Sequence, residues 1–437
     1  MSLIRMSWRF LWGRSLVTIL TIAGVALGAA LISSVLTLRR ETQRTFVAES
    51  GLVDLVVGAK GSPLQLVLSS LYHLDMPTGN IPYSRYEALK KDPRVTAAVA
   101  LGLGDNYHGF RIVGTGPEYF ELRDRESTGA SAAHFHIAEG HVFAANFEAV
   151  IGSEVARQSH LKVGDKFVGS HGLVAIAGGE EHDEFPYHVV GILAAGGGSA
   201  DRAIFTPLGS VWAIHDHEKA EHAALAGDTK ETSSTTTGHG SYSFLRTGAS
   251  TKRSNEREVT AVLVQLKTPG MRLWMAEEIK NQTESMAAIP INEMLRLYQQ
   301  ILAPIERALL AVAYLVVVVS ALTVLTTLYQ SAERRRRDMA ILRTLGAHPR
   351  DIFILFLLEG VLLTLGGLVA GAVLGHLLVG FSGYFFRAST GLVVNGWSMD
   401  ATEVHALLFV AAIGVVAGLL PGCIAYRRAP AVDLAAA

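Results

Sequence analysis

The stretch ERRRRDMAILRTLGAH, residues 333–348, decides how this chain is organised, because it lies between two long apolar runs. Lys and Arg residues that flank membrane spans are retained on the cytoplasmic side. The spacing of Met339, Ile341, Leu342 and Leu345 predicts an apolar stripe on a short helix that continues from the basic cluster. A helix that is basic at one end and apolar along one face is suited to docking a partner protein at the membrane surface.

The composition predicts a membrane protein with a large water-facing part. Half of the 437 residues are hydrophobic (50%), the mean hydropathy is +0.32, and the formal net charge is −1. Soluble globular proteins are rarely so apolar. The near-neutral charge argues against a nucleic-acid partner, which normally requires a basic excess. The single cysteine, Cys423, lies in the last apolar run, so the water-facing part must fold without disulfides.

Four apolar runs are long enough to cross a bilayer, and they are Leu16–Leu38, Ala308–Tyr329, Ile352–Phe386 and Ala406–Tyr426. A signal peptide is the alternative for the first run, but its length favours an uncleaved anchor. The third run is interrupted only by Glu359 and His376. It is longer than one bilayer requires and barely long enough for two helices with a turn. We therefore predict one long helix, tilted or bent, that projects beyond the membrane.

Arginines orient the four spans. They precede the first span, occupy residues 334–350 and follow the last span, which places both termini in the cytoplasm. The predicted fold is membrane α-helical, with four transmembrane helices and a large α+β extracytoplasmic domain inserted between spans 1 and 2. The N-terminus with transmembrane helix 1 is predicted at 1–38, the extracytoplasmic domain at 39–304, transmembrane helix 2 at 305–330 and the cytoplasmic coupling segment at 331–351. Transmembrane helix 3 follows at 352–386, a short outer loop at 387–404, transmembrane helix 4 at 405–426 and the cytoplasmic tail at 427–437.

The extracytoplasmic domain mixes strand and helix patterns. Strands are predicted near residues 150, 166, 187–193, 203–208 and 258–265, and residues 273–302 are predicted to be mostly helical. The glycines of 196–201 lack the Lys-Ser/Thr of a P-loop and the spacing of a dinucleotide fingerprint, so we predict a turn and no phosphate cradle.

Two features inside the spans point to helix contacts. Glycines at four-residue spacing permit close approach of neighbouring helices, and those predicted to do so are Gly24, Gly28, Gly367, Gly371, Gly375, Gly414 and Gly418. Glu359 lies near the cytoplasmic end of the third span, where a carboxylate is costly in lipid. We predict that it pairs with an arginine of the preceding loop in a structural or coupling role; a proton or ion site is the alternative.

Histidines beside carboxylates form a third candidate feature, because this mixture suits Zn²⁺. Their spacing matches no fixed zinc motif, so a solvated acidic, His-rich loop is the alternative. The metal hypothesis, with the transporter serving metal homeostasis, rests on His182, His188, His215, His217 and His222.

The chain resembles the MacB/FtsX-type permeases of ABC transporters along nearly its whole length. The resemblance rests on one span, a large external domain and three further spans, with ERRRRDMAILRTLGA after the second. The ending LPGCIAYRRAPAVDL, residues 420–434, is similar to the closing pattern of that family. External pieces 150–156, 161–167 and 189–208 resemble its periplasmic core domain.

This resemblance implies an inner-membrane permease, usually dimeric, that pairs with a cytoplasmic ABC ATPase and transmits ATP-driven movement to the external domain. No GxxxxGK[ST] motif occurs in the chain, so ATP and Mg²⁺ are expected to act through the partner, and no cofactor is expected to bind directly. A periplasmic adaptor or substrate-binding protein is a further expected partner, alongside membrane lipid. The coupling contact is expected at Glu333, Arg334, Arg335, Arg336, Arg337, Asp338, Arg343, Leu345 and Gly346; the simpler interpretation is that the arginines only set topology.

Two other functional classes remain as alternatives. One is a membrane-anchored periplasmic binding or sensor module, for zinc among other ligands, without transport. A membrane enzyme is disfavoured because no Ser/His/Asp, Cys/His or HExxH arrangement stands out. The sequence leaves the substrate and the direction of transport open.

Overall fold

The computed structural model describes residues 3–123, 134–171, 185–217, 257–390 and 395–427. The chain divides into two compact units. Unit 1, the membrane unit, contains residues 1–44, 298–387 and 393–437, and unit 2, the core domain, contains residues 45–297 and 388–392.

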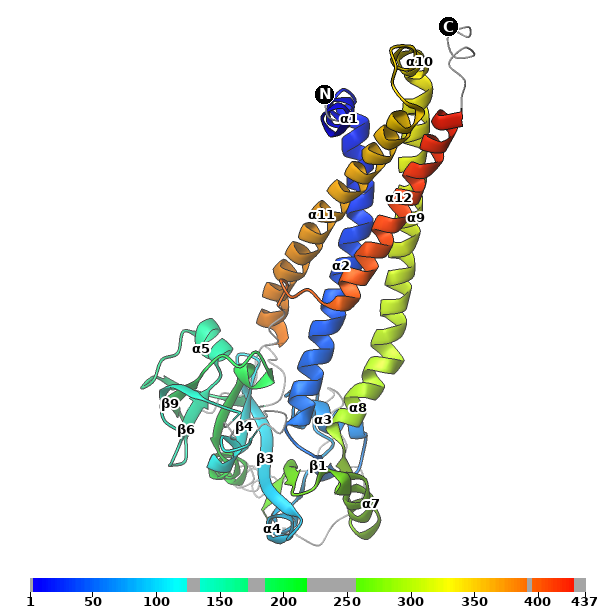
Figure 1. Ribbon diagram of the computed structural model, residues 1–437. Helices are drawn as coiled ribbons and strands as arrows, with labels where there is room; N and C mark the ends of the chain where they lie inside the picture. Colours follow the sequence, from blue (N-terminus) through cyan, green and yellow to red (C-terminus); the bar gives the residue numbers. More distant parts are fainter. Residues whose placement is uncertain (1–2, 124–133, 172–184, 218–256, 391–394, 428–437) are drawn as a thin grey trace, which may run out of the picture. The chain divides into compact units, whose positions relative to one another are not determined.

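Four helices in the described residues are long and apolar enough to cross a membrane. They are α2 (Ser15–Gly51), α9 (Ala303–Arg334), α11 (Pro349–Thr390) and α12 (Ala401–Arg427), and they run side by side in Figure 1. Two short helices, α1 (Leu3–Trp12) and α10 (Arg336–Thr344), complete the unit. At 1.5 Å per residue, the 42-residue helix α11 is about 63 Å long, twice the roughly 30 Å hydrocarbon core of a bilayer.

The membrane helices pack through small residues and expose large apolar ones. Gly367, Gly371 and Gly375 of α11 lie against α2; a Cβ built on Gly371 would stand 2.5 Å from the backbone oxygen of Ala26. Gly24 and Gly28 lie against Ser320 and Val317 of α9, Gly414 against Thr364, and Gly418 against Gly360. Large apolar side chains are exposed on the outside of all four helices, as expected for surfaces that face lipid, and they include Leu27, Leu322, Val369 and Leu408.

The core domain is built on one mixed sheet with strand order β13-β1-β12-β3-β4-β10-β6-β9-β5. The pairs β10–β4 and β6–β9 are parallel and the other pairs along this path are antiparallel. Its strands are β1 (Leu55–Ala59), β3 (Val95–Tyr107), β4 (Phe110–Thr115), β5 (Ile137–Gly140), β6 (Glu148–Ile151), β9 (Tyr187–Leu193), β10 (Ala203–Pro207), β12 (Ala261–Leu266) and β13 (Ser285–Ala288), with β7 (Lys166–Phe167) and β8 (Ser170–His171) paired beside them. The strands β2 (Ile81–Pro82) and β11 (Glu258–Val259) form a separate pair.

Both faces of this sheet are covered, which explains why its central strands are apolar at nearly every position. On β1, Val56 packs into one core while its neighbours Leu55 and Val57 pack into another on the opposite face. Helices α3 (Pro63–Ser70) and α8 (Pro290–Leu297) contribute to the first core. Helices α4 (Tyr83–Lys91) and α7 (Arg272–Gln282) contribute to the second. Strands β6, β9 and β10 and helix α5 (Ser153–Ser159) form a third cluster.

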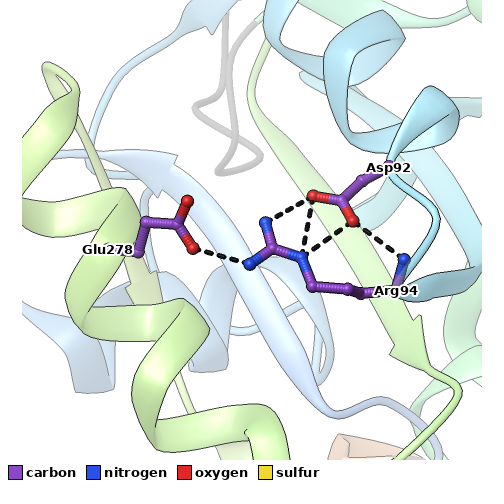
Figure 2. Close-up of polar contacts among 3 residues, drawn as sticks. All are labelled: Asp92, Arg94 and Glu278. Atoms are coloured by element: carbon purple, nitrogen blue, oxygen red, sulfur yellow. Dashed lines mark hydrogen bonds and ion pairs between the residues drawn. The ribbon is translucent and has the colours of Figure 1, made fainter.

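An arginine at the start of β3 fastens helix α7 to the sheet. Figure 2 shows Arg94 between Asp92, at 2.6 Å, and Glu278 of α7, at 2.7 Å. The guanidinium also lies 5.0 Å from the centre of the Trp274 ring. The hydrogen bonds from Arg94 hold the pKa of the Asp92 carboxyl below its ordinary value.

Two local expectations require comment. The region 273–302 is helical at both ends, but strand β13 interrupts it and pairs with β1, a long-range contact that local periodicity does not reveal. Helix α11 continues to Thr390 and α12 begins at Ala401, so both helices extend into the predicted outer loop, residues 387–404.

The glycines of 196–198 lie in a turn in which the amides of Gly196, Gly197 and Ser199 are already bonded. Gly196 and Gly197 donate hydrogen bonds to the carboxylate of Asp201, at 3.0 and 2.9 Å. Ser199 donates its amide to Glu49, near the end of α2. Internal carboxylates therefore occupy the donors that a phosphate would require.

Candidate functional site: the segment between spans 2 and 3

The coupling segment folds into helix α10 because its sequence provides both helix ends. Helix α9 breaks at Arg335, and α10 begins at Arg336, with Asp338 in its first turn and Arg343 in its last. Both charges oppose the helix dipole at their ends and stabilise it. Gly346 then adopts φ +100°, and the Ala347 amide donates to Leu342 O at 2.9 Å, which closes the helix.

The N-terminus of the next helix, α11, is also capped by its own sequence. Asp351 accepts a hydrogen bond from the His348 amide at 3.0 Å, and Pro349 is the first residue of α11. Residues 345–351 therefore define the turn from α10 into α11, and they fix the direction of α10 at the N-terminal end of span 3.

One face of α10 is buried against the membrane unit. Met339 is 7% exposed and packs with Ile352, Leu355 and Phe356 of α11. Leu342 joins the same cluster, as do Met6 and Phe10 of α1. The four apolar residues predicted to form one stripe therefore lie on two faces of the helix, and Met339 and Leu342 are the two that face inward.

The opposite face of α10 is exposed. Ile341 is 42% and Leu345 78% exposed, and Arg337 and Thr344 are exposed beside them. At 100° per residue these four positions fall on one side of the helix. The exposed residues of the predicted coupling set are Glu333, Arg334, Arg337, Asp338, Leu345 and Gly346. We call Arg337, Ile341, Thr344 and Leu345 the α10 outer face.

The four consecutive arginines do not share one role. Arg335 turns inward: its Nη1 lies 3.9 Å from Glu359 Oε2, with the two side chains 13% and 5% exposed. Its guanidinium carbon is 4.0 Å from the centre of the Phe10 ring, and its Nη2 donates to Phe10 O at 3.2 Å. Arg336 pairs with Glu333 at 3.4 Å on the surface, and Arg343 is half-buried. Arg334 and Arg337 project outward.

The Glu359–Arg335 pair is the arrangement anticipated for Glu359, between a carboxylate in a span and an arginine of the preceding loop. It joins the start of α10 to α11 inside the membrane unit, and the Phe10 contacts add α1 to the same junction. Removing one partner of a buried charge pair is costly, because the other charge is left uncompensated.

The predicted metal ligands do not come together within the described residues. His182 and His222 lie outside those residues, and no group of three His, Cys, Asp or Glu side chains within them is placed to hold a metal ion. His188 is exposed on β9, His215 lies over Gly104 of β3, and His217 packs 5.3 Å from the Phe185 ring. The zinc hypothesis stays a prediction.

Sequence reasoning missed a second polar pair in the spans, His376 with Glu403, at 3.1 Å. The signal was available, because each is an ionisable residue in or beside an apolar run, where such residues normally serve a purpose. Their partnership was not visible, since 27 positions separate them.

Two family models together match most of the chain. The model of the MacB-like periplasmic core domain matches residues 18–268, and that of the FtsX-like permease C-terminal region matches residues 310–430. The chain belongs to the MacB/FtsX-type ABC transporter permeases. The second match contains the whole coupling segment, so α10 and its neighbours are part of the family's permease region.

Relatives of this permease agree with that assignment. An uncharacterised ABC transporter permease of Methanocaldococcus jannaschii is 29% identical over 153 residues, which cover 34% of this chain and 38% of the relative. The pyoverdine export ATP-binding/permease protein PvdT of Pseudomonas putida is 23% identical over 97% of this chain and 58% of its own length. This permease therefore spans less than two thirds of the curated relatives it matches. Among solved structures, the periplasmic region of MacB from Actinobacillus actinomycetemcomitans aligns over 54% of this chain and 89% of its own, with 10% identity and a TM-score of 0.29.

Family membership favours a permease over a membrane-anchored sensor module. The membrane unit and the mixed core domain agree with the predicted fold class.

Proposed function

We propose that this chain is the permease subunit of an ABC transporter complex and that it docks a separate cytoplasmic ATPase through the α10 outer face. The observation that carries the proposal is the division of α10 into two faces. A surface-exposed apolar pair, Ile341 and Leu345, stands next to Arg337 on a helix whose other face is seated firmly on α11 and α1. Exposed apolar side chains rimmed by charge are typical of protein interfaces.

The seat makes α10 suitable for transmitting movement. Force applied to the outer face reaches α11 through Met339 and Phe356, and through the ion pair between Arg335 and Glu359. Helix α2 in turn is continuous from the membrane unit to residue 51 of the core domain. ATP hydrolysis in the partner would thus move the spans and, with them, the extracytoplasmic domain, in export or extraction of a substrate.

The rest of the complex follows from the family. We propose a dimer of permeases in the inner membrane, both termini cytoplasmic, with ATP and Mg²⁺ bound by the partner. PvdT is named as a combined ATP-binding/permease protein. For the present chain we propose that the ATPase is a separate subunit.

The experiment is purification of the tagged chain from its native membrane, with mass spectrometry of bound proteins. An ABC ATPase in about equal amount is expected. Truncating Ile341 and Leu345 to Ala should weaken its binding at least tenfold, because burying each side chain contributes about 1.5–3 kcal/mol and 1.4 kcal/mol is a factor of ten.

The charge on this face has its own control. Arg337→Glu should release the ATPase, whereas Arg350→Glu, which makes the same charge change in the first turn of α11, should retain it. Both variants reduce the positive charge of the loop equally, so an effect on membrane topology would appear in both. If Arg337→Glu and the double Ala variant both retain as much ATPase as the unmodified chain, the docking role is contradicted.

A further inference from the structure

A buried histidine–carboxylate pair joins spans 3 and 4 within the membrane unit. His376 of α11 and Glu403, in the first turn of α12, have side chains only 6% and 2% exposed. His376 Nε2 lies 3.1 Å from Glu403 Oε1. Within the described residues, neither atom has a hydrogen-bond partner of conventional geometry, so each has only the other to compensate its burial.

The other ring nitrogen determines where the protons are. His376 Nδ1 is 2.7 Å from the backbone oxygen of Gly396. A carbonyl oxygen only accepts hydrogen bonds, so Nδ1 carries a hydrogen. In a neutral imidazole Nε2 then has a bare lone pair, directed at the oxygen of Glu403. If Glu403 were ionised at the same time, two acceptors would face each other at 3.1 Å in a buried site, which is unfavourable.

One additional proton removes this conflict. It can reside on Nε2, giving an imidazolium–carboxylate ion pair, or on Glu403, giving a carboxylic acid facing a neutral imidazole. We propose that His376 and Glu403 are a proton-binding site that holds one shared proton and exchanges it with water on the membrane face from which the core domain extends. The ligand of this site is the proton itself.

Glu403 also lines a polar cavity, which provides the exchange route. The cavity has a volume of about 130 Å³, enough for several water molecules, and its walls come from α2 and the residues leading into α12. Its lining includes Thr37, Arg40, Gln43, Asp400 and Glu403. The connection between α11 and α12 follows an odd number of crossings, as the core domain does, so both lie on the same side of the membrane.

The charges around the pair favour a bound cation. From α2 come Arg39, Arg40 and Glu41, and from the residues leading into α12 comes Asp400. Arg39 is paired with Glu306 of α9 at 3.0 Å, and Arg40 acts electrostatically on Asp400. Counting Glu403 as well, the acids in this neighbourhood outnumber the arginines, and a proton on the pair reduces the excess.

The proton also holds the chain between the two spans. Gly396 fits so closely on α11 that a Cβ there would stand 2.6 Å from the Gly380 nitrogen. Next to it, Glu41 of α2 accepts hydrogen bonds from the Asn395 amide, at 3.2 Å, and the Ser398 hydroxyl, at 2.8 Å. Loss of the shared proton would set Glu403 against His376 and release residues 395–400 from this position.

The test is spectroscopy of the full chain in lipid nanodiscs near neutral pH. With ¹⁵N-labelled histidine, the signal lost in His376→Gln identifies this residue, and its shifts report whether each ring nitrogen carries hydrogen. Infrared difference spectra against Glu403→Gln report whether that carboxyl is protonated. We expect a hydrogen on Nδ1 and the extra proton on either Nε2 or Glu403. In Glu403→Gln, Nε2 should become a bare acceptor of the Gln amide.

A histidine nearby supplies the matched control. His405 is exposed on α12, two positions from Glu403, so His405→Gln should leave the His376 signals unchanged. A bare Nε2 together with an ionised Glu403 would overturn the proposal, as would an Nε2 that still carries hydrogen in Glu403→Gln. Transfer to D₂O should replace the shared hydrogen in folded protein; retention of that hydrogen would overturn access from water. None of these readouts requires an ATPase, so the result is independent of the proposed docking.

Discussion

Removing the carboxylate of Glu359 should destabilise the membrane unit by about 3 kcal/mol. In Glu359→Gln the side-chain volume is kept, but Arg335 loses the carboxylate with which it is paired, 3.9 Å away. Coulomb's law at an effective dielectric constant of about 20 gives roughly 4 kcal/mol at this distance. Removing one partner of a buried ion pair typically costs about 3–5 kcal/mol. We expect the low end because Arg335 keeps the Phe10 ring and carbonyl as partners.

The measurement is the thermal unfolding midpoint in detergent micelles, followed by intrinsic fluorescence and circular dichroism. With about 2.1 cal/mol/K of unfolding entropy per residue, 3 kcal/mol corresponds to a decrease of roughly 3 °C if the whole chain unfolds together, and more if the membrane unit unfolds alone. Replacing both residues by Met should recover most of the loss, since an apolar pair of similar volume is often neutral or stabilising.

The exposed pair of the same segment is the control. Glu333 and Arg336 are 3.4 Å apart with 44% and 31% exposed side chains, so Glu333→Gln should change the midpoint little. The reasoning is refuted if Glu359→Gln behaves like Glu333→Gln, or if the double Met variant is less stable than both single variants.

Two further predictions concern packing in each unit. Gly371→Ala should destabilise the membrane unit by about 1–3 kcal/mol, because the new Cβ would stand 2.5 Å from Ala26 O. Gly380→Ala, which has open space on the same helix, should leave the stability unchanged or raise it by up to about 1 kcal/mol through helix propensity. The thermal unfolding midpoint should therefore fall in the first variant and stay the same or rise in the second. Arg94→Met should cost about 1.5–3 kcal/mol through its lost bonds to Asp92 and Glu278, against less than about 0.5 kcal/mol for the exposed Lys90→Met. Because Arg94 lowers the pKa of Asp92, the ionised Asp92 contributes to folding stability above its ordinary pKa of 3.8, and this contribution is lost as the pH falls below that value. The loss of stability on acidification should therefore be smaller in Arg94→Met than in the wild type.

The sequence predicted those features that depend on local pattern. Span number and the long third helix follow from uninterrupted apolar length, and glycines such as Gly371 follow from their spacing. Helix α10 follows from the apolar spacing of Met339, Ile341, Leu342 and Leu345. The sequence does not predict which arginine turns inward, because Arg334 to Arg337 are chemically identical. Only the break in the helix at Arg335 distinguishes them.

Long-range pairing was the other limit. Strand β13 is four residues of ordinary sequence, and it becomes a strand because β1 lies beside it. In the same way His376 is an isolated histidine until the return of the chain brings Glu403 to it. Periodicity reports what one segment does, whereas pairing requires knowing which segments meet.

Helix α11 carries one residue of each of the two buried polar pairs described above, and this arrangement constrains how it moves. Glu359 ties its N-terminal part to Arg335, His376 ties its C-terminal part to Glu403, and between them Gly367, Gly371 and Gly375 hold it against α2. A Cβ-free contact along three glycines at four-residue spacing allows sliding or tilting but leaves no side chains to rotate out of the way. A push on α10 would therefore displace α11 as a rigid rod, and the state of the His376–Glu403 proton would determine whether its far end stays attached to α12.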